Sequence, residues 1–374
     1  MKLLYLCEFS AGVDGVWNRV YNIAKQLAKR HEVFTFSSNI EKGSGKKVVP
    51  FEERNGIKIY RFPVSFRLGE NALFWNYESK LREIKPDIVH AHVFRHPHST
   101  SAPAAAKKVG ARAFLTTHAP FVEHELRSFL LNFAVSLYDA VLAKKTLNSY
   151  EKVIAIAKWE IPELRALGCK NEKIVYIPNG FPSEFIKQKP KFSEKKEKTV
   201  LFLGRIAPVK NIELLLRAFK KVVVKDHRVK LKLIGQMEEG YGSVILPLIK
   251  RLDLSKHVEL PGPVYDLKRK ISLIDNSDIF VLPSKREASP QALIEAMARE
   301  KTIISSDNPG SRDIISDGKN GFLFNSEEEL SDKLEYVLKN FGKLKNLSTK
   351  ARKDVSQLTW ENLAAKEEQL YRIK

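Results

Sequence analysis

The sequence has little sulfur and no long hydrophobic run. Only two of its 374 residues are cysteine, Cys7 and Cys169, so we expect no disulfide framework. No segment reaches the roughly 18 consecutive apolar residues of a membrane span, and the most apolar one, residues 129–143, contains Asn132 and Asp139. The apolar stretch that opens the sequence is too short for a signal peptide. These absences together predict a reducing, cytoplasmic environment.

Internal repeats and low-complexity stretches are also missing, which argues against a solenoid and against disorder. At 374 residues, with 43% of them hydrophobic, the chain is longer than one hydrophobic core normally supports. We therefore expect two well-packed globular domains.

Negative charge is scarce relative to positive charge. The chain carries 64 lysine and arginine residues against 44 aspartate and glutamate residues, a formal net charge of +20. This excess predicts attraction to nucleic acid, anionic lipid or phosphorylated substrates. The basic blocks at residues 187–198 and 339–353 lack the interleaved aromatic side chains that stack on bases, so we interpret them as solvated surface and expect no nucleic-acid partner. Residues 129–143 are interpreted as an amphipathic helix, which either belongs to the core or rests on an anionic membrane.

Short apolar runs rich in β-branched residues alternate with helical patterns along most of the chain, which predicts βαβ units and parallel sheets. In the first half the expected strands cover residues 3–7, 33–37, 57–62, 88–91, 113–116, 152–155 and 174–176. In the second half they cover residues 199–204, 229–234, 258–260, 278–282, 302–305 and 321–323. Residues 182–198 have the Lys, Glu, Ser and Pro content of an exposed linker. The expected fold class is therefore α/β, with Rossmann-like domains at residues 1–183 and 184–357.

Two cationic side chains follow the strand that opens the second domain. That strand ends at Gly204, Arg205 comes next, and Lys210 precedes Asn211, which is a suitable cap for the following helix. A fork-shaped guanidinium and an ammonium at the carboxyl edge of a strand suit a diphosphate leaving group, on which negative charge builds as the bond to it breaks. Taken alone, the two residues are equally compatible with ordinary surface cations.

Two glutamates, Glu287 and Glu295, lie eight residues apart where the strand at 278–282 gives way to a helix. Ser289 is a good N-cap and Pro290 a good first helical residue, which places Glu287 in the loop and Glu295 in the second helical turn. A helix N-terminus at the carboxyl end of a strand suits a phosphate, whose sugar and ribose the two carboxylates can hold. Acidic pairs are usually just solvated, but the two cations in the same predicted sheet favour a binding site.

The first domain offers weaker signals. A glycine loop at residues 10–15, which includes Gly12, permits close backbone approach to a ligand, although such loops more often form tight turns. Its spacing matches neither a dinucleotide fingerprint nor a phosphate-binding P-loop. His118 follows the strand at 113–116, where an imidazole can bond a sugar hydroxyl.

The remaining histidines bear on metal binding. The pairs His90/His92 and His96/His98 are of a kind that can ligate zinc, but His90 lies within an expected strand and no cysteine or acidic cluster accompanies them. No Asp-x-Asp sequence occurs in the chain either, which disfavours a sugar transferase that holds its diphosphate through a metal. We therefore predict no metal and no other cofactor, with basic side chains neutralising the diphosphate.

Taken in order, these motifs resemble those of retaining glycosyltransferases with the GT-B fold, often called group 1 or family four. The similarity spans essentially the whole chain: the loop at Gly12, Asp-Ile-Val-His-Ala-His ending at His92, Thr-His at 117–118, Ile-Pro-Asn-Gly at 177–180, Gly204-Arg205 with Lys210, Glu287 to Glu295 with Ala-Met-Ala behind, and Asp-Gly-Lys-Asn-Gly-Phe-Leu at 317–323. The resemblance implies two Rossmann-like domains facing a central cleft. It also implies that the second domain binds most of the donor, that the first binds the acceptor, and that a helix at 358–374 crosses back to the first domain.

The resemblance further implies roles for single residues. Arg205 and Lys210 would hold the donor diphosphate, Glu295 the ribose hydroxyls and Glu287 the donor sugar. His118 would bond the transferred sugar, which Gly12 would approach through its backbone. The expected catalytic residues are Glu287, His118, Arg205 and Lys210, and the expected donor-binding set adds Gly12, Ser289, Pro290, Gln291, Glu295 and Val264, the last in the loop 258–264 that borders the base.

The chain departs from the family pattern in two places. Pro290 stands where a glycine is usual and removes a backbone N–H that can reach the sugar, which leaves the identity of the donor sugar open. Arg-Glu-Lys-Thr at 299–302 replaces a usual Gly and Pro and is interpreted as a variant helix exit.

The predicted function is a metal-independent, retaining transfer of a hexose from a nucleoside-diphosphate sugar to a hydroxyl on a sugar, glycan or lipid. One alternative is a disaccharide phosphorylase or synthase of the same fold, in which inorganic phosphate would drive sugar release. The other is a polyanion-binding protein with a vestigial site, which would bind nucleic acid in a salt-sensitive way. Front-face displacement and a covalent carboxylate intermediate both stay open as routes to retention.

Overall fold

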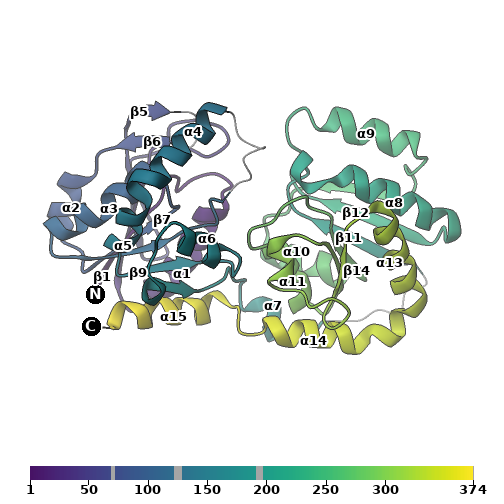
Figure 1. The fold of residues 1–374 in the computed structure, drawn as a ribbon. Helices are drawn as coiled ribbons and strands as arrows, with labels where there is room; N and C mark the ends of the chain where they lie inside the picture. The colour runs from purple at the N-terminus through teal and green to yellow at the C-terminus, as the bar shows by residue number, and fades with distance from the viewer. Residues whose placement is uncertain (69–71, 122–128, 191–196, 374) are drawn as a thin grey trace. The chain divides into compact units, whose positions relative to one another are not determined.

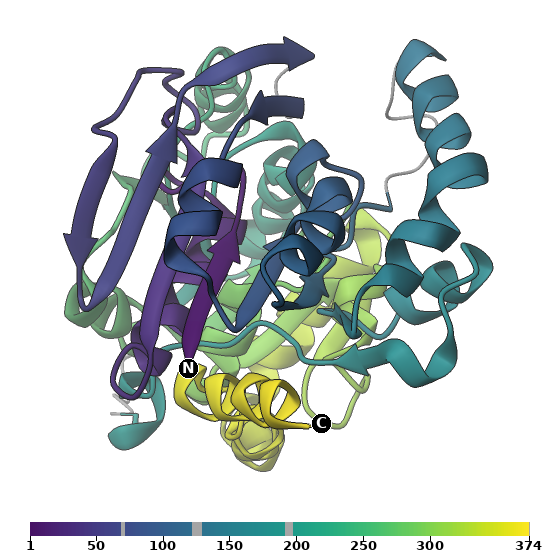
Figure 2. The same ribbon diagram turned by 90° about the vertical axis from the view of Figure 1, so that its left-hand side faces the viewer.

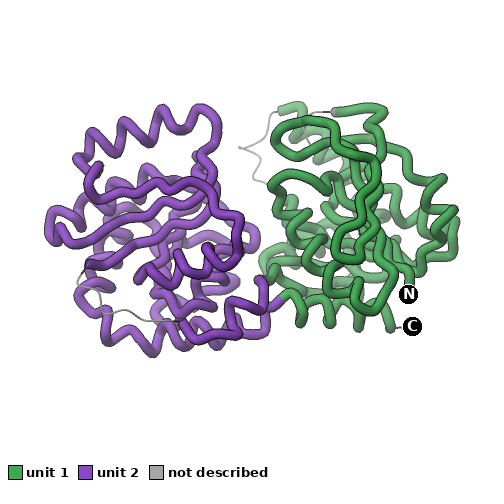
Figure 3. Tube along the Cα trace, turned by 180° about the vertical axis from the view of Figure 1, so that it is seen from behind, with its two compact units in different colours: residues 1–180, 360–374 green, residues 181–359 purple. Residues whose placement is uncertain are grey.

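A computed structural model describes residues 1–68, 72–121, 129–190 and 197–373. The chain forms two compact units, shown in Figure 3. Unit 1 comprises Met1–Gly180 and Trp360–Lys374, and unit 2 comprises Phe181–Thr359. The sequence prediction put the boundary after residue 183 and the return at residue 358, a few residues from these positions. Each unit contains a parallel or mainly parallel sheet covered by helices, so the α/β class is confirmed.

The sheet of unit 1 has the strand order β10-β9-β8-β7-β1-β2-β4-β3. All neighbouring strands are parallel except β3 and β4, which are antiparallel. The bounds are β1 (Lys2–Leu6), β2 (Glu32–Ser38), β3 (Phe51–Arg54), β4 (Ile57–Phe62), β7 (Ile88–His92), β8 (Arg112–Thr116), β9 (Lys152–Ala155) and β10 (Ile174–Tyr176). The seven strands expected for this half are present. The edge strand β3 and the antiparallel pair β5 (Val64–Leu68) and β6 (Ala72–Trp75) were not expected.

Helices cover both faces of this sheet, because side chains of a strand alternate between its faces. Leu3 and Tyr5 of β1 pack with one set of helices, whereas Leu4 and Leu6 pack with the other. The first set is α1 (Gly15–Leu27) and α15 (Trp360–Arg372), and the second is α2 (Glu78–Ile84), α3 (Pro97–Lys108), α5 (Lys144–Ser149) and α6 (Glu160–Ala166). The described residues of unit 1 also form α4 (Phe129–Tyr138), the π-helix η2 (Asp139–Ala143) and the short η3 (Asn171–Lys173).

The helix α15 is separated from the rest of unit 1 by the whole of unit 2, yet it lies beside α1 (Figures 1 and 2). Trp360, Leu363 and Tyr371 bury their side chains in the core of unit 1. A buried ion pair joins the two helices, with Arg19 Nη2 2.7 Å from Glu367 Oε1. Burial raises the pKa of Glu367, and the charge of Arg19 opposes that rise. The return of this helix to the first unit, implied by the family resemblance, is therefore confirmed.

The sheet of unit 2 is entirely parallel, with the order β13-β12-β11-β14-β15-β16. Its strands are β11 (Lys198–Leu203), β12 (Val229–Ile234), β13 (Val258–Gly262), β14 (Ile279–Leu282), β15 (Thr302–Ser306) and β16 (Phe322–Phe324). The order reverses between β11 and β14, and ligands of open α/β sheets bind outside the carboxyl ends of the strands at such a reversal. The helices are α7 (Glu184–Lys187), η4 (Pro208–Lys210), α8 (Ile212–Lys225), α9 (Gly242–Arg251), α10 (Leu267–Asp275), α11 (Gln291–Ala298), α12 (Pro309–Arg312), α13 (Glu327–Asn340), η5 (Phe341–Leu344) and α14 (Lys345–Val355).

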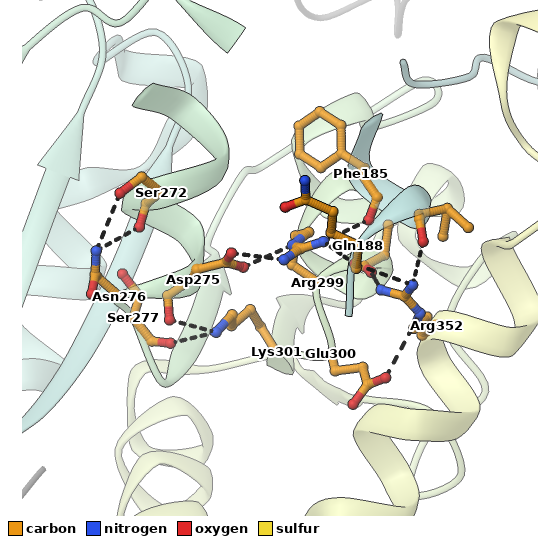
Figure 4. Close-up of polar contacts among 12 residues, drawn as sticks. Phe185, Gln188, Ser272, Asp275, Asn276, Ser277, Arg299, Glu300, Lys301 and Arg352 are labelled. Atoms are coloured by element: carbon orange, nitrogen blue, oxygen red, sulfur yellow. Dashed lines mark hydrogen bonds and ion pairs between the residues drawn. The ribbon is translucent and has the colours of Figure 1, made fainter. Parts of the chain in front are cut away.

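The unusual residues after α11 form a buried polar hub in unit 2 (Figure 4). Arg299 makes a two-pronged contact with Asp275 of α10, at 2.7 Å for each prong, and donates to the carbonyls of Phe185 and Gln188. Lys301 donates to the carbonyls of Asp275 and of Ser277 at 3.0 and 2.8 Å. Burial lowers the pKa of Lys301 to about 8. The variant helix exit therefore links the end of α11 to α7 and α10.

Candidate active site

The loops after β11 and β14 bring Lys210 and Glu287 together. Lys210 Nζ lies 2.6 Å from Glu287 Oε1, and both side chains are largely covered. The loops themselves are joined by the hydrogen bond from Lys285 N to Val209 O at 2.9 Å. An ammonium and a carboxylate thus stand at the reversal point of the sheet, where the sequence analysis expected them.

Arg205 is not part of this pair. Its Nη1 donates to Glu238 Oε2 at 2.9 Å, and its side chain is 62% exposed. Glu238 belongs to the loop between β12 and α9. The two expected diphosphate cations therefore have different partners: the lysine has a covered carboxylate, and the arginine has a solvated one.

Glu295 sits in the second turn of α11, as predicted, with only 1% of its surface exposed. Gln291 Nε2 donates to Glu295 Oε1 at 3.0 Å, and Lys270 Nζ of α10 lies 2.5 Å from Glu295 Oε2. Sequence reasoning missed Lys270, because the residue lies 25 positions earlier in a helix that carries no motif. The carboxylate expected to hold ribose hydroxyls is thus neutralised by a neighbouring lysine.

The start of α11 differs from the prediction by one residue. Ser289 was expected to cap the helix and Pro290 to begin it, but the helix begins at Gln291 and Pro290 occupies the preceding position. A proline ring fixes φ and leaves ψ free, and the extended ψ of 103° keeps Pro290 outside the helix. Asn211 likewise precedes α8 without a side-chain cap, because it adopts a left-handed backbone. Val264 lies just beyond β13, partly buried against the core of unit 2.

The backbone that carries Glu287 is packed against α12. A Cβ atom on Gly310 would stand 2.5 Å from Glu287 O and 2.8 Å from Ala288 O. Contacts this short do not occur for real side chains, so only glycine allows α12 to approach the loop. The position of Glu287 therefore depends on Gly310, which the sequence analysis did not single out.

In unit 1 the glycine loop is folded against its own unit. Gly12 has a left-handed φ of +84°, and a Cβ there would lie 2.3 Å from Lys42 O. Gly12 thus lies close to the backbone of Lys42, and its approach to the donor sugar stays a prediction. No other residue type fits this turn without displacing the backbone of Lys42.

His118 follows β8 in a left-handed conformation, with φ of +61°. Its loop is held by the buried carboxylate of Glu160, which accepts hydrogen bonds from the backbone N–H groups of Ala119, Ile156 and Ala157 at 2.8–2.9 Å. His118 Nε2 lies 2.8 Å from His92 Nδ1. Burial, followed by the charge of Arg19, holds the pKa of His118 well below its usual value, so its imidazole is neutral at pH 7.

The four histidines considered as zinc ligands separate into two groups. His90 and His92 stack on each other inside unit 1, and His90 contacts Tyr371 Oη at 2.5 Å and Thr116 Oγ1 at 2.8 Å. Both of its ring nitrogens are therefore engaged. His96 and His98, by contrast, meet Glu8, which comes from the loop after β1. The sequence analysis found no cysteine or acidic cluster beside these histidines and did not foresee this single carboxylate, which reaches them because β1 and β7 are neighbours in the sheet.

The apolar segment at 129–143 is helical, as predicted, but α4 buries none of its residues. Phe129 is 83% exposed and Leu130 is 78% exposed. The alternative in which this helix belongs to the core is therefore excluded for α4, which stands apart from the sheet at the upper right of Figure 2. No helix among the described residues is long and apolar enough to cross a bilayer.

Comparisons with known proteins agree with this architecture. Residues 183–354 match the family model described as glycosyl transferases group 1, and residues 13–185 match that of glycosyltransferase family 4. An uncharacterised glycosyltransferase of Methanocaldococcus jannaschii is 26% identical, over 88% of this chain and 86% of its own. The phosphatidyl-myo-inositol mannosyltransferase of Mycolicibacterium smegmatis is also 26% identical, over 86% and 80%. Among solved structures, Anabaena HepE in complex with UDP-glucose has a TM-score of 0.77 at 19% identity and full coverage of both chains.

The chain belongs to the group 1 glycosyltransferases of the GT-B fold. It is accordingly an enzyme that transfers a sugar from a nucleotide-sugar donor.

Proposed function

We propose that this glycosyltransferase moves a hexose from a nucleoside-diphosphate sugar to a hydroxyl acceptor, with retention of configuration and without a metal on the diphosphate. The observation that carries the proposal is the contact of Lys210 with Glu287 at the reversal point of the unit 2 sheet. It supplies a fixed positive charge where the diphosphate would leave, and fixed charges stabilise a transition state without reorganisation.

In this proposal the donor exchanges the contacts of the resting site for its own. Lys210 turns from Glu287 to the diphosphate, joined by the solvated Arg205, and Glu287 becomes free to accept a hydroxyl of the donor sugar. Glu295 binds the ribose once the side chain of Gln291 moves away from it, while Lys270 stays beside the carboxylate. HepE, whose fold this chain shares, was solved with UDP-glucose, which supports a uridine nucleotide as the first donor to examine.

Retention follows when the acceptor oxygen attacks from the face that the diphosphate leaves. The bond from the anomeric carbon to the diphosphate breaks, the bond to the acceptor oxygen forms on the same face, and a departing phosphate oxygen takes the acceptor proton. Neutral His118 then serves as a hydrogen-bond partner of the transferred sugar. A covalent route would instead need a carboxylate nucleophile at the anomeric carbon.

For the acceptor we propose a lipid-linked hydroxyl reached from the cytoplasmic face of an anionic membrane. The exposed apolar side chains of α4 support this, since a helix that is apolar and unburied exposes a patch typical of interaction sites. Lys144 and Lys145 follow on the same segment and are exposed, which suits anionic headgroups. The mannosyltransferase relative is named for a phosphatidyl-inositol acceptor, a further reason to examine lipids first.

The function is tested by thermal-shift screening against UDP-, GDP- and ADP-sugars, each with and without EDTA, because a ligand that binds only the folded state raises its melting temperature. We expect one nucleotide series to raise the Tm equally in both conditions. The anomeric configuration of the product, read by proton NMR, then reports on retention. A Tm shift that appears only with a divalent ion, or an inverted product, contradicts the proposal.

A further inference from the structure

Three side chains outside the proposed donor site converge in unit 1. Glu8 follows β1, while His96 and His98 flank Pro97 at the start of α3, directly after β7. Since β1 and β7 are adjacent and parallel, these loops leave the sheet at the same edge. One oxygen of Glu8 and one nitrogen from each histidine lie within 4.8 Å of one another.

The atoms that face each other are poorly satisfied. Glu8 Oε2, His96 Nδ1 and His98 Nδ1 are all inaccessible, and none of them makes a hydrogen bond of acceptable geometry. Glu8 and His98 are each only 3% exposed. His96 Nδ1 lies against Glu8 Oε2 as an ion-pair contact, but that contact leaves His98 Nδ1 unsatisfied. A buried polar atom without a partner is costly, so the unsatisfied His98 Nδ1 beside this ion pair indicates a missing ligand.

The outer contacts of the cluster already orient it for a cation. His98 Nε2 lies 2.8 Å from the carbonyl of His92, so Nε2 carries the proton and Nδ1 presents its lone pair. Leu73 N donates to the other carboxylate oxygen, Glu8 Oε1, at 2.9 Å. Backbone contacts of this kind fix the tautomer and rotation of metal-binding side chains.

The loop that delivers His96 is strained. Val93 and Arg95 both have left-handed backbones, with φ of +70° and +71°, and a β-branched residue rarely adopts this conformation. The strain is held in place by the two-pronged contact of Arg95 with Asp139, at 2.8 and 2.6 Å. Strained residues of this kind cluster at binding and catalytic sites.

We propose that Glu8, His96 and His98 form a binding site for one divalent transition-metal ion of the zinc class. Two imidazole nitrogens and one carboxylate oxygen are a ligand set that zinc accepts, with a fourth position left for water or an oxygen ligand. The open position lies toward His96, the most exposed of the three side chains. The rival occupant is a single proton shared by His96 and Glu8.

The direct test uses wild-type protein that has been stripped of metal with a chelator and never unfolded. It is titrated with Co²⁺ while the visible absorption is recorded, and separately with Zn²⁺ by calorimetry. We expect one tightly bound ion per chain and a tetrahedral-type cobalt spectrum. Absence of a saturable site for both ions overturns the proposal and favours the shared proton.

Variants assign the ligands. Glu8→Gln keeps an oxygen for Leu73 N but removes the charge, and His96→Ala removes a partly exposed ligand, so at least one is expected to fold. Each substitution should weaken metal binding by at least about tenfold, since replacing even a residue that only supports a metal ligand costs about that much affinity. His227→Ala, which alters an exposed histidine of unit 2, should leave affinity unchanged. Wild-type affinity in both site variants contradicts the assignment.

The proposed metal site and the proposed donor site can be tested independently, so that one can be refuted while the other stands. The three ligands belong to unit 1, whereas Lys210 and Glu287 belong to unit 2. Nucleotide binding in EDTA therefore reports on the donor site alone, and cobalt absorption without nucleotide reports on this site alone.

Discussion

Lys210 Nζ rests 2.6 Å from Glu287 Oε1 across two loops that are 77 residues apart in the chain. Each residue is thus the other's resting partner. We expect Lys210→Ala to lower kcat by about a hundredfold or more, because it removes charge from the place where the leaving group develops its own. Lys210→Arg should recover part of the loss. Steady-state kinetics with an unchanged circular dichroism spectrum checks this, and near-normal turnover in Lys210→Ala would refute the assigned role.

The contact of Lys270 with Glu295 predicts a stability effect. Lys270→Ala leaves a carboxylate with 1% exposure without its counter-charge, and breaking a buried pair in this way costs about 3 kcal/mol. Urea unfolding followed by circular dichroism measures the loss in unit 2. The control is Lys268→Ala, an exposed position of the same helix. Adding Glu295→Gln should restore part of the stability; if it lowers stability further, the carboxylate charge is not the cause.

Gly310→Ala tests whether the backbone behind Glu287 matters for turnover. The new methyl group would overlap Glu287 O and must push the loop away from α12. We expect a fall in kcat of about tenfold or more, since small misplacements of catalytic groups cost up to about a hundredfold. Gly342→Ala is the matched control, because a methyl there meets nothing within 4 Å. Equal kinetics in the two variants would show that the loop absorbs the change.

Acid should weaken unit 1 through His90. Burial lowers the pKa of His90 to about 3, so the native imidazole stays neutral while the unfolded one takes up a proton below about pH 6.5. Its contribution to stability is complete above pH 6.5 and is lost as the pH falls toward 3, by up to about 1.4 kcal/mol per pH unit. All four tryptophans lie in unit 1, so their fluorescence in urea reports its unfolding. His90→Gln should show a shallower pH dependence; an unchanged slope excludes His90 as its source.

The exposed face of α4 predicts membrane binding. Wild-type protein should pellet with vesicles that contain anionic lipid and much less with neutral ones. Replacing Leu130 and Phe133 by serine should reduce pelleting several-fold without loss of stability, because both side chains are exposed. Val224→Ser, at an exposed apolar position of unit 2, serves as the control. Negligible binding to both vesicle types would remove the lipid surface from the proposed function.

The parallel sheets and the loops with Lys210 and Glu287 could be predicted from the sequence, because strand periodicity and residues at strand ends are local signals. The strand β3 could not, since its sequence Phe-Glu-Glu-Arg is mostly polar and lies at a sheet edge. The exposure of α4 could not be predicted either, because the sequence pattern of an apolar helix is the same whether the helix lies in a core or on a surface.

Partners that are distant in the chain were missed for a different reason. Lys270 meets Glu295, and Glu8 meets His96, only because separate elements are adjacent in the fold. Neither pair has a characteristic spacing in the sequence, so no motif predicts these contacts. The left-handed backbone of Asn211 and the extended Pro290 likewise result from how their loops close, which side-chain preference alone does not determine.

The place of α15 in the core of unit 1 has a consequence for biosynthesis. A ribosome makes residues 1–180 first, but Trp360, Leu363 and Tyr371 complete that core and emerge only after the whole of unit 2. Unit 2 is a continuous segment and can fold as soon as it leaves the tunnel. The half that is synthesised first must therefore be the last to finish, because one face of its sheet is covered only in part, by α1, until α15 has been made.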